Sequence, residues 1–229
     1  MPPSTINHQP TIIRTIIIAN GNLNHPDSDR LHLRPDDFII AADGGANHCS
    51  ALGIRPDVVI GDLDSARSRV LADLEADGVD IIRYPARKDQ ADLELAIDLA
   101  VSRGPDEILI LGALGGRWDM TLTNMLLLIR AEQAGIACRL VDGPQEIRII
   151  QGKKSLTVNG APGDTLSLVP LGDDVGGVTL TGMEYPLNQA TLQFGGSRGV
   201  SNTLTTPGAT VTVETGRVIC ILIRKGESG

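Results

Sequence analysis

The stretch FIIAADGGAN, residues 38–47, carries the pattern that decides the fold class. An apolar run of five residues is followed at once by an acid, two glycines and a helical stretch. This order predicts a buried strand that turns directly into a helix. Apolar runs also end in glycines and acids at residues 56–65 and at residues 107–119. Repeated alternation of strand and helix predicts a mostly parallel, Rossmann-like α/β sheet covered by helices.

Apolar runs and helical periodicity place the expected elements of this first part. We expect strands at residues 11–19, 38–42, 57–60, 79–83, 107–111 and 136–141. We expect helices at residues 46–52, 65–77, 89–103 and 119–134. The last two helices carry apolar residues at helical spacing, and each is followed by a glycine, as the C-termini of helices often are. In the last helix these apolar residues are Leu122, Met125, Leu126 and Ile129.

The composition changes near residue 143, where helical periodicity ends and glycine and threonine become frequent. Short alternating runs follow, with Gly, Pro and Asn between them. This pattern favours a small antiparallel β-sandwich domain, with a barrel as the alternative. The expected strands lie at residues 146–150, 155–158, 165–169, 177–180, 190–194, 210–214 and 217–223. We therefore expect two domains, residues 1–143 and 144–229, with the junction at Gly143-Pro144.

The charge balance limits the partners of this chain. It holds 28 acids and 20 bases among 229 residues, a net charge of −8. Such a chain repels nucleic acid and anionic membranes unless its bases are clustered, and aromatic residues make up only 2%, too few for a base-stacking platform. No apolar run approaches the about 18 residues of a membrane helix, and no targeting segment is visible. We expect a cytoplasmic protein with three reduced cysteines that binds neither nucleic acid nor membrane.

Acids follow the expected strands at the points where these strands end. They lie in four segments, Asp43-Gly44-Gly45-Ala46-Asn47, Gly61-Asp62-Leu63-Asp64-Ser65, Lys88-Asp89-Gln90-Ala91-Asp92 and Gly115-Gly116-Arg117-Trp118-Asp119. Since the carboxyl ends of the strands line the ligand crevice of an open α/β sheet, these acids should converge at one edge. Acids grouped in this way repel one another unless a cation lies between them. Oxygen ligands without His or Cys suit a hard cation such as Mg²⁺.

Each acid also has a purely structural explanation when it is taken alone. Asp43 beside two glycines is typical of a turn. Asp64, Asp89 and Asp119 are each suited to be the N-cap of the helix that follows. The convergence of several acids at one edge is therefore the stronger signal.

The same loops carry groups that suit a polyphosphate. The pairs Gly44-Gly45 and Gly115-Gly116 let backbone amides approach a phosphate, while Arg87, Lys88 and Arg117 can neutralise its charge. Together with the acids, these groups point to Mg²⁺–nucleotide chemistry. Neither a Walker A sequence nor a G-x-G-x-x-G fingerprint is present.

The four segments, in this order, resemble the thiamine pyrophosphokinases, also called thiamine diphosphokinases. A fifth resemblance lies in the C-terminal part, at Tyr185-Pro186-Leu187 and Gly196-Ser197-Arg198-Gly199-Val200-Ser201-Asn202. The resemblance spans roughly residues 12–223. It implies an α/β catalytic domain followed by a β-sandwich, a homodimer with thiamine at its interface, and pyrophosphoryl transfer from ATP to thiamine with release of AMP.

The resemblance also implies roles for single residues, carried over by position. It implies Mg²⁺ ligands at Asp62, Asp64 and Asp92. It implies contacts with ATP, or catalytic roles, for Asp43, Gly44, Gly45, Asn47, Lys88, Asp89 and Arg117. It implies that Asp119 and Asn124 complete one wall of the catalytic site, where Asn124 contacts the nucleotide. It implies that thiamine meets Ser197, Ser201 and Asn202 in the β-domain of the partner subunit.

Two positions depart from the family pattern. The third segment usually has Thr where this chain has Ala91, which removes one hydroxyl contact. The fourth usually reads Asp-His where this chain has Asp119-Met120. Because a thioether cannot transfer protons, no His-dependent step is expected at Met120.

The implied reaction is attack of a primary alcohol on the β-phosphorus of ATP, assisted mainly by positioning and charge neutralisation. Asp92 and Asp119 both remain open as acceptors of the hydroxyl proton. We expect Asp62→Ala or Asp64→Ala to lower turnover by about a hundredfold or more.

Two other functions compete with this one. The first is a pyrophosphokinase that acts on another alcohol, such as a pterin methanol. The second is a non-catalytic sensor of thiamine or nucleotide. The Ser201-Asn202 motif favours thiamine as the substrate, and the intact acids argue against a sensor.

Overall fold

A ten-stranded sheet runs through the molecule in a computed structural model that describes residues 13–226. Six strands are parallel: β1 (Arg14–Ile18), β2 (Phe38–Ala42), β3 (Val58–Gly61), β4 (Asp80–Arg83), β5 (Glu107–Leu111) and β6 (Ala137–Asp142). Four are antiparallel: β7 (Gln145–Gln151), β9 (Thr165–Pro170), β12 (Asn202–Thr203) and β14 (Arg217–Ile223). The order across the sheet is β12-β9-β14-β7-β6-β5-β1-β2-β3-β4.

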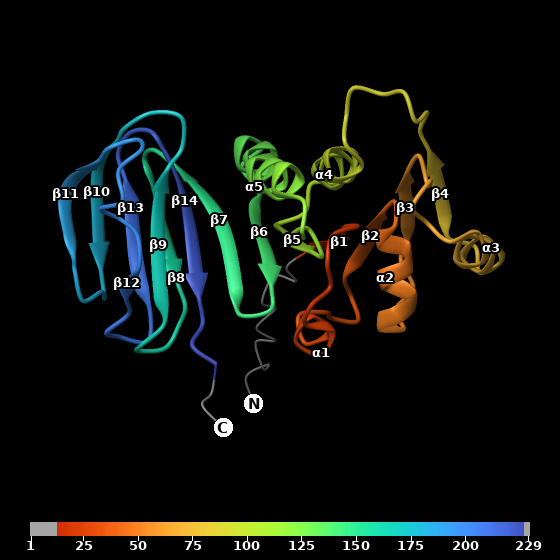
Figure 1. The fold of residues 1–229 in the computed structure, drawn as a ribbon, viewed down its shortest axis with the longest axis horizontal. Coiled ribbons are helices and arrows are strands. Elements are labelled where there is room, and N and C mark those ends of the chain that lie inside the picture. The colour runs from red at the N-terminus through yellow and green to blue at the C-terminus, as the bar shows by residue number, and fades with distance from the viewer. Residues whose placement is uncertain (1–12, 227–229) are drawn as a thin grey trace, which may run out of the picture.

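Helices cover both faces of the parallel part (Figure 1). They are α1 (Pro26–Arg30), α2 (Gly45–Leu52), α3 (Ser68–Ala76), α4 (Asp92–Ser102) and α5 (Trp118–Gln133). Successive side chains of a strand point to opposite faces, so Ile17 packs in the core beneath α4 and α5, while Ile16 and Ile18 pack in the core beneath α2 and α3. Burial on both faces explains the unbroken apolar runs in the sequence. No helix among the described residues is long and apolar enough to cross a membrane.

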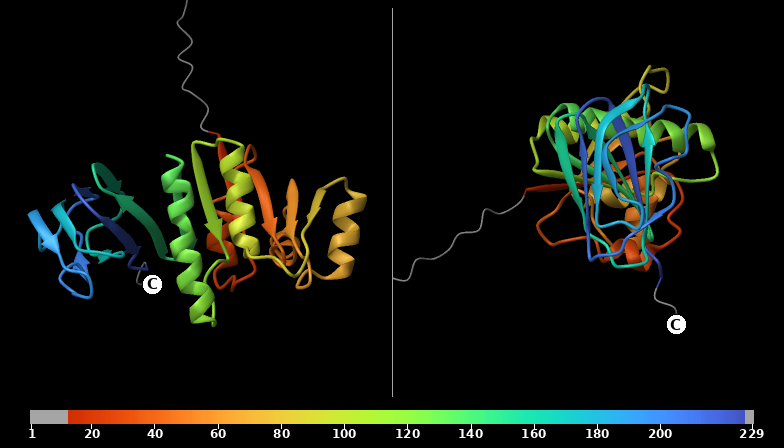
Figure 2. Two further views of the ribbon diagram at one scale, coloured as in Figure 1. Left: turned by 90° about the horizontal axis from the view of Figure 1, so that it is seen from above. Right: turned by 90° about the vertical axis from the view of Figure 1, so that its left-hand side faces the viewer.

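The C-terminal part is a β-sandwich that shares the large sheet. Its second sheet contains β8 (Lys154–Val158), β10 (Val175–Thr181), β11 (Leu187–Leu192) and β13 (Ala209–Val213), in the order β11-β10-β13-β8. A third core fills the space between the two sheets, with Val178 and Val211 on one side and Leu166 and Leu168 on the other. In Figure 2 the blue C-terminal strands lie at one end of the molecule, beyond the green helix α5.

The predicted fold class, an α/β part followed by a β-sandwich, is confirmed, but one sheet continues through the composition change. Gly143 and Pro144 form the turn of a hairpin in which β6 and β7 pair antiparallel. Gly143 has φ +53°, and a Cβ there would clash with the ring of His25. The composition change therefore marks the point where strand pairing switches from parallel to antiparallel.

The predicted strands and helices are present, with ends shifted by a few residues. The helix α1 and the two-residue strand β12 were not predicted, because elements this short show no periodicity. The first two residues of the strand expected at residues 11–19 lie outside the described residues. Helix α5 buries Thr121, Asn124, Leu128 and Ala131, so two of its apolar residues, Leu122 and Leu126, are exposed.

The three cysteines are buried thiols in α2, β6 and β14. Burial raises the pKa of Cys49 and of Cys220 to about 12, and it also raises the pKa of Cys138. Such thiols carry almost no thiolate at neutral pH, so they act as packing residues.

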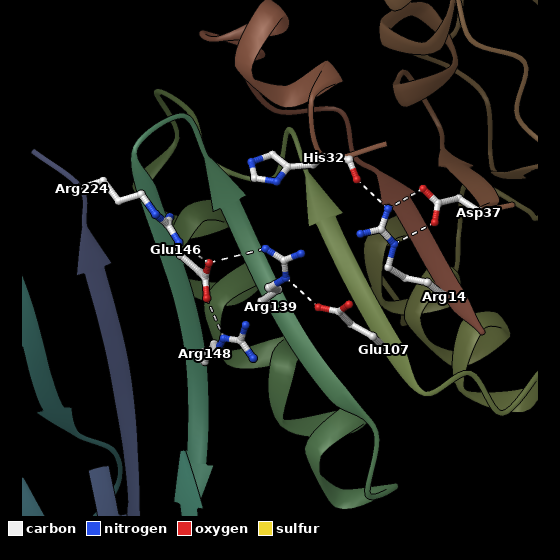
Figure 3. A network of polar contacts seen from close by, with 8 residues as sticks. All are labelled: Arg14, His32, Asp37, Glu107, Arg139, Glu146, Arg148 and Arg224. Carbon is white, nitrogen blue, oxygen red and sulfur yellow. Dashed lines mark hydrogen bonds and ion pairs between the residues drawn. The ribbon is translucent and has the colours of Figure 1, made fainter. Parts of the chain in front are cut away.

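A row of charged side chains crosses the large sheet at the parallel-to-antiparallel switch (Figure 3). Arg139 of β6 donates a 2.7 Å hydrogen bond to Glu107 of β5 and lies 3.5 Å from Glu146 of β7. Glu146 also pairs with Arg148 at 2.7 Å and with Arg224 at 3.0 Å. Burial alone raises the pKa of Glu146, but these arginines outweigh burial and hold that pKa below its ordinary value. The row therefore joins strands on both sides of the switch.

Candidate active site

Three of the predicted acids converge at the carboxyl edge of the parallel strands. Asp43 follows β2, Asp62 follows β3 and Asp92 begins α4. Their nearest carboxylate oxygens all lie within 4.8 Å of one another. Asp43 is buried, and the other two are partly buried. Within residues 13–226 they form the one group of three or more acids, histidines or cysteines close enough to share a metal ion. We call these three residues the acid cluster.

The turn after β2 holds the Asp43 carboxylate in place. Asp43 has φ +48°, a left-handed conformation that Asp tolerates better than most residues. The side-chain amide of Asn20 donates to its Oδ2, and the backbone N–H of Ser65 donates to its Oδ1, both at 3.2 Å. The turn interpretation of Asp43 is therefore correct, and the same turn aims its carboxylate into the acid cluster.

Lys88, from the loop between β4 and α4, lies against the acid cluster. Its Nζ is 3.2 Å from Oδ2 of Asp62 and 2.9 Å from Oδ1 of Asp92. Burial alone lowers the pKa of Lys88, but the two carboxylates outweigh burial and raise it. The backbone N–H of Asp64 and the Lys88 ammonium keep the pKa of Asp62 below its ordinary value. At neutral pH Asp62 is therefore ionised and Lys88 is charged.

Asp92 presents a buried oxygen atom to the acid cluster. Its Oδ1 is bound by no backbone N–H, and its charged partner is the Lys88 ammonium, which lies 2.9 Å away. A Cβ on Gly61, where φ is +145°, would lie 2.7 Å from this oxygen. Glycine is thus needed for Asp92 to enter the cluster. Carboxylate oxygens that pair only with a mobile cationic side chain fit a hard cation such as Mg²⁺.

A cavity of about 300 Å³ opens beside the acid cluster. Its walls come from the segments after β1, β2 and β5 and from the first turns of α4 and α5, and they include Asn20, Asp43, Asp92, Gly116, Arg117, Met120, Thr121 and Asn124. The Nδ2 of Asn124 donates to the carbonyl of Ala113 at 2.7 Å, which leaves its Oδ1 buried and without a partner. This atom is free to accept a hydrogen bond from a ligand.

Thr121 was missed by the sequence analysis. Its hydroxyl bonds to both the N–H and the carbonyl of Gly115 at 3.2 Å, so it fixes the loop after β5 to α5. Nothing in the sequence separates Thr121 from an ordinary polar residue of a helix. Asn20 follows a predicted strand, where the segment Asn20-Gly21-Asn22 gives only a weak signal for a further nucleotide contact; the structure places Asn20 in the wall of the cavity.

The glycines of the site loops differ in how much space surrounds them. A Cβ on Gly44 would lie 2.0 Å from the Asn20 side chain, and one on Gly45 would lie 2.0 Å from the carbonyl of Ile18. Gly45 therefore allows α2 to pack closely on β1, while Gly44 leaves room for the Asn20 side chain. A Cβ on Gly116 would meet nothing within 4 Å, and its φ is not positive. No contact within the described residues requires glycine there.

The other predicted acids lie outside the acid cluster. Asp64, Asp89 and Asp119 are exposed. Their interpretation as N-caps is wrong, because the N-caps of α3, α4 and α5 are Arg67, Ala91 and Arg117, and none of these helices has a side-chain cap hydrogen bond.

The exposed pair Arg117 and Asp119 forms a 2.6 Å ion pair at the start of α5. The hydrogen bond from Arg117 is the main cause of a lowered pKa of Asp119. Arg117 lines the cavity, so this ion pair stands at its edge.

Asn47 fastens the loop that carries Asp62 and Asp64. Its Nδ2 donates to the carbonyl of Ser65 at 3.0 Å, and its Oδ1 accepts from the N–H of Arg67 at 2.9 Å. Its amide group is therefore used within the protein, a role that the sequence pattern did not predict.

The residues implied for thiamine lie far from the acid cluster in the same chain. Ser197 and Ser201 are exposed, while Asn202 is buried in β12. Asn202 exchanges hydrogen bonds with the backbone of Tyr185 at 3.0 and 2.7 Å, so it positions the Tyr185 segment. In the large sheet β12 lies six strand positions from β1 and seven from β2. At about 4.8 Å per strand this separation is about 30 Å.

Comparison with known proteins decides the family. Residues 30–140 match the family model described as thiamin pyrophosphokinase, catalytic domain. Residues 147–220 match the model described as thiamin pyrophosphokinase, vitamin B1 binding domain. The chain belongs to the thiamin pyrophosphokinase family. It is 32% identical over 182 residues to the thiamine pyrophosphokinase of Bacillus subtilis, an alignment that covers 80% of this chain and 85% of that protein.

Solved structures of the thiamin pyrophosphokinase family have the same architecture. The Bacillus subtilis thiamine pyrophosphokinase superposes with a TM-score of 0.85 at 29% identity, covering 93% of this chain and 99% of that one. The thiamin pyrophosphokinase of Geobacillus thermodenitrificans gives 0.81 at 26%, covering 94% and 99%. The thiamin pyrophosphokinase of Candida albicans gives 0.79 at 18%, covering 93% and 89%, and at that identity it supports the fold alone.

Proposed function

We propose that this chain transfers the pyrophosphoryl group of ATP to the hydroxyl of thiamine, giving thiamine diphosphate and AMP. Membership of the thiamin pyrophosphokinase family supports this reaction. The observation that carries it in this chain is the acid cluster, which lies beside a cavity that also contains Arg117 and the unpartnered oxygen of Asn124. Acids for a metal and donors for phosphate at one sheet edge suit a metal-bound nucleotide.

The residues present fit Mg²⁺. Asp43, Asp62 and Asp92 would hold the ion, and Asp64, two residues from Asp62, remains a proposed further ligand. When bound, Mg²⁺ neutralises phosphate charge and favours nucleophilic attack at phosphorus. The buried Oδ1 of Asp92 supports this assignment, because its charged partner in the protein is a single cation, the Lys88 ammonium.

The remaining polar groups would bind and orient the nucleotide. Lys88 and Arg117 would stabilise charge on the transferred group and on the leaving AMP. Asn124 would accept a hydrogen bond from the nucleotide through its free Oδ1. Further nucleotide contacts are proposed for residues of the same loops, namely Gly44, Gly45, Asn47 and Asp89.

In the chemical step the thiamine hydroxyl oxygen bonds to the β-phosphorus, and the bond from that phosphorus to the oxygen of the AMP part breaks. AMP leaves with the bonding electron pair. The hydroxyl proton passes to a carboxylate, either Asp92, which lines the cavity, or Asp119, which stands at its edge beside Arg117. Met120 lines the cavity at the position where the resemblance implies a His, and its thioether cannot transfer a proton, so the two carboxylates are the proposed acceptors.

A homodimer would complete the site. Thiamine cannot bridge the about 30 Å between β12 and the acid cluster within one chain. Helix α5 offers a contact surface, because Trp118, Leu122 and Leu126 are spaced four residues apart and are 82%, 56% and 37% exposed. In the dimer, Ser197 and Ser201 of one subunit would meet the thiamine bound at the acid cluster of the other, with Asn202 holding the Tyr185 segment beside them.

One assay tests the proposed function. Purified protein is incubated with ATP, Mg²⁺ and thiamine, and AMP and thiamine diphosphate are quantified; we expect equal amounts of both. AMP formed with a pterin methanol, and not with thiamine, would replace the proposed substrate. Binding of thiamine or ATP without AMP would identify a sensor. We propose that the protein is located in the cytoplasm.

A further inference from the structure

We propose that Lys88 is a resident counter-ion of the acid cluster, whose ammonium group must leave before a divalent cation can bind there. In the structure this ammonium pairs with Asp62 at 3.2 Å and with Asp92 at 2.9 Å. Within residues 13–226 no other Lys, Arg or His forms an ion pair with any of the three acids. Lys88 therefore provides the cation that three converging carboxylates require.

The position of Lys88 overlaps with the site that a metal ion would need. The acid-cluster oxygens lie within 4.8 Å of one another, and Mg²⁺ binds carboxylate oxygens at about 2.1 Å. A cation bound between Asp62 and Asp92 would lie close to the ammonium nitrogen as it stands in the structure. Two cations at such a distance repel each other strongly in a site of low exposure, and the side chain of Lys88 is 12% exposed. The two cations cannot share the cluster in this arrangement.

The chain permits Lys88 to move. It belongs to the loop between β4 and α4, where both neighbours, Arg87 and Asp89, are exposed. Its four-carbon stem rotates freely once its two ion pairs are lost. If the proposed function is correct, the released ammonium finds new anionic partners in the phosphates that arrive with the metal. Lys88 would thus make metal binding alone weak and metal binding with nucleotide strong, which is a coupling between the two ligands.

Competition with the metal and a purely supporting role of Lys88 predict opposite changes in metal affinity when Lys88 is removed. If Lys88 only holds Asp62 and Asp92 in position, its removal disorders the acids and weakens metal binding. If it competes with the metal, its removal leaves the acids with no cation and strengthens metal binding. The affinity for a metal ion alone, measured without nucleotide or thiamine, separates these two roles.

The experiment measures binding of Mn²⁺ alone by titration calorimetry and by the electron paramagnetic resonance signal of free Mn²⁺. We expect Lys88→Met to bind Mn²⁺ about tenfold or more tightly than the unchanged chain. Lys88→Arg, which keeps the charge, should stay near the unchanged affinity. Lys154→Met is the matched control, because Lys154 also forms an ion pair, at 2.6 Å with Glu132, but outside the acid cluster. Equal or weaker binding of Mn²⁺ by Lys88→Met would overturn the proposal.

Thermal unfolding of the same variants, without and with Mn²⁺, gives a second measurement. Lys88→Met should unfold at a lower temperature than the unchanged chain without metal, since its acids repel one another. Added Mn²⁺ should raise its unfolding temperature at a lower concentration than in the unchanged chain. A higher half-saturating concentration in the variant would contradict competition. Neither measurement uses ATP or thiamine. The result for Lys88 therefore stands even if the assay detects no thiamine diphosphate.

Discussion

At the scale of the residue, the same amino acid serves different purposes in neighbouring loops. Gly61 is required by the protein, because its φ is +145° and a Cβ would meet the Asp92 carboxylate. Gly116 has open space around it and an ordinary φ, so no contact within the protein explains it. Gly61 is therefore needed to form the acid cluster, whereas the space beside Gly116 is open to a ligand.

We expect Gly116→Ala to bind ATP more weakly without a loss of stability. An added methyl group should raise KM for ATP about tenfold by hindering close approach of the phosphates. The unfolding temperature should stay unchanged or rise slightly, since alanine restricts the unfolded chain. Steady-state kinetics and thermal unfolding measure the two effects. Gly226→Ala, also in open space, is the control, and an unchanged KM for ATP in Gly116→Ala would exclude a ligand contact there.

We expect Asp62→Asn to lower turnover by about a hundredfold or more while the chain stays folded. The amide keeps the shape of the side chain but removes the charge that a cation needs. The resemblance implies that Asp62 and Asp64 are equally important, with a similar loss for either alanine variant. Asp64 is exposed and lies outside the acid cluster, so Asp64→Asn tests whether the clustered acid matters more. AMP formation is measured over a range of Mg²⁺ concentrations. Near-normal turnover of Asp62→Asn at limiting Mg²⁺ would falsify the metal assignment.

At the scale of the element, helix α4 lacks a cap where it enters the site. Its N-cap is Ala91, in an extended conformation with φ −70° and ψ 154°, and no side chain bonds its first N–H groups. Asp92 and Glu94 in the first turn interact favourably with the helix dipole. Ala91 therefore leaves the N-cap directly before Asp92 without a hydroxyl that could accept a hydrogen bond.

We expect Ala91→Thr to stabilise the protein by about 1 kcal/mol, because threonine accepts a hydrogen bond from a free N–H of the first turn. Denaturant unfolding measures the free energy of unfolding. Ala91→Val has the shape of threonine without its hydroxyl, so it should not stabilise. Equal stabilities of the two variants would show that the hydroxyl makes no capping bond.

At the scale of the whole molecule, the charged row of Figure 3 joins the parallel and antiparallel parts of one sheet. Glu146 is its centre, because three arginines meet this one carboxylate, whose side chain is 9% exposed. Removing the charge leaves three guanidinium groups without a shared partner. The loss should therefore lower the stability of the sheet as a whole.

We expect Glu146→Gln to lower the free energy of unfolding by about 2 kcal/mol at pH 7. The pKa of Glu146 is lowered in the folded state. The ionised Glu146 therefore stabilises the fold fully at pH values above the pKa of Glu in the unfolded chain, about 4.3. This stabilisation is lost as the pH falls through the lower pKa of Glu146 in the folded chain. The difference between the two proteins should shrink below about pH 4.

Urea unfolding at several pH values measures the effect of Glu146→Gln. Glu75→Gln is the control, because Glu75 pairs with Arg83 on the surface and should contribute little. A difference that stays constant from pH 7 to acid would mean that the charge of Glu146 does not stabilise the fold.

The proposed dimer predicts that two inactive variants restore activity together. Asp92→Asn should inactivate the acid cluster, and Asn202→Ala should release the Tyr185 segment of the other half of the site. In mixed dimers one of the two sites is intact, so about a quarter of full activity should return after the chains are mixed and reassembled. Absence of any recovery, with mixed dimers detected by mass spectrometry, would show that each site belongs to one chain.

The sequence by itself determined the fold class and the edge of the sheet where the acids meet. Apolar runs such as residues 38–42 are unbroken because both faces of a parallel strand are buried, and a strand that turns directly into a helix places its last acid at the carboxyl edge. These signals are local, so they can be read from adjacent residues. The thiamine pyrophosphokinase motifs are contiguous segments for the same reason.

The tertiary structure alone decided which acids share a site and what the other polar groups do. Asp43, Asp62 and Asp92 lie together because three neighbouring elements bring them there, while Asp64 is exposed. Lys88 between two of them, the buried oxygen of Asn124 and the outward face of α5 all depend on distances between segments remote in sequence. Charge pairing, hydrogen bonding and burial act through space, so no pattern of adjacent residues determines them.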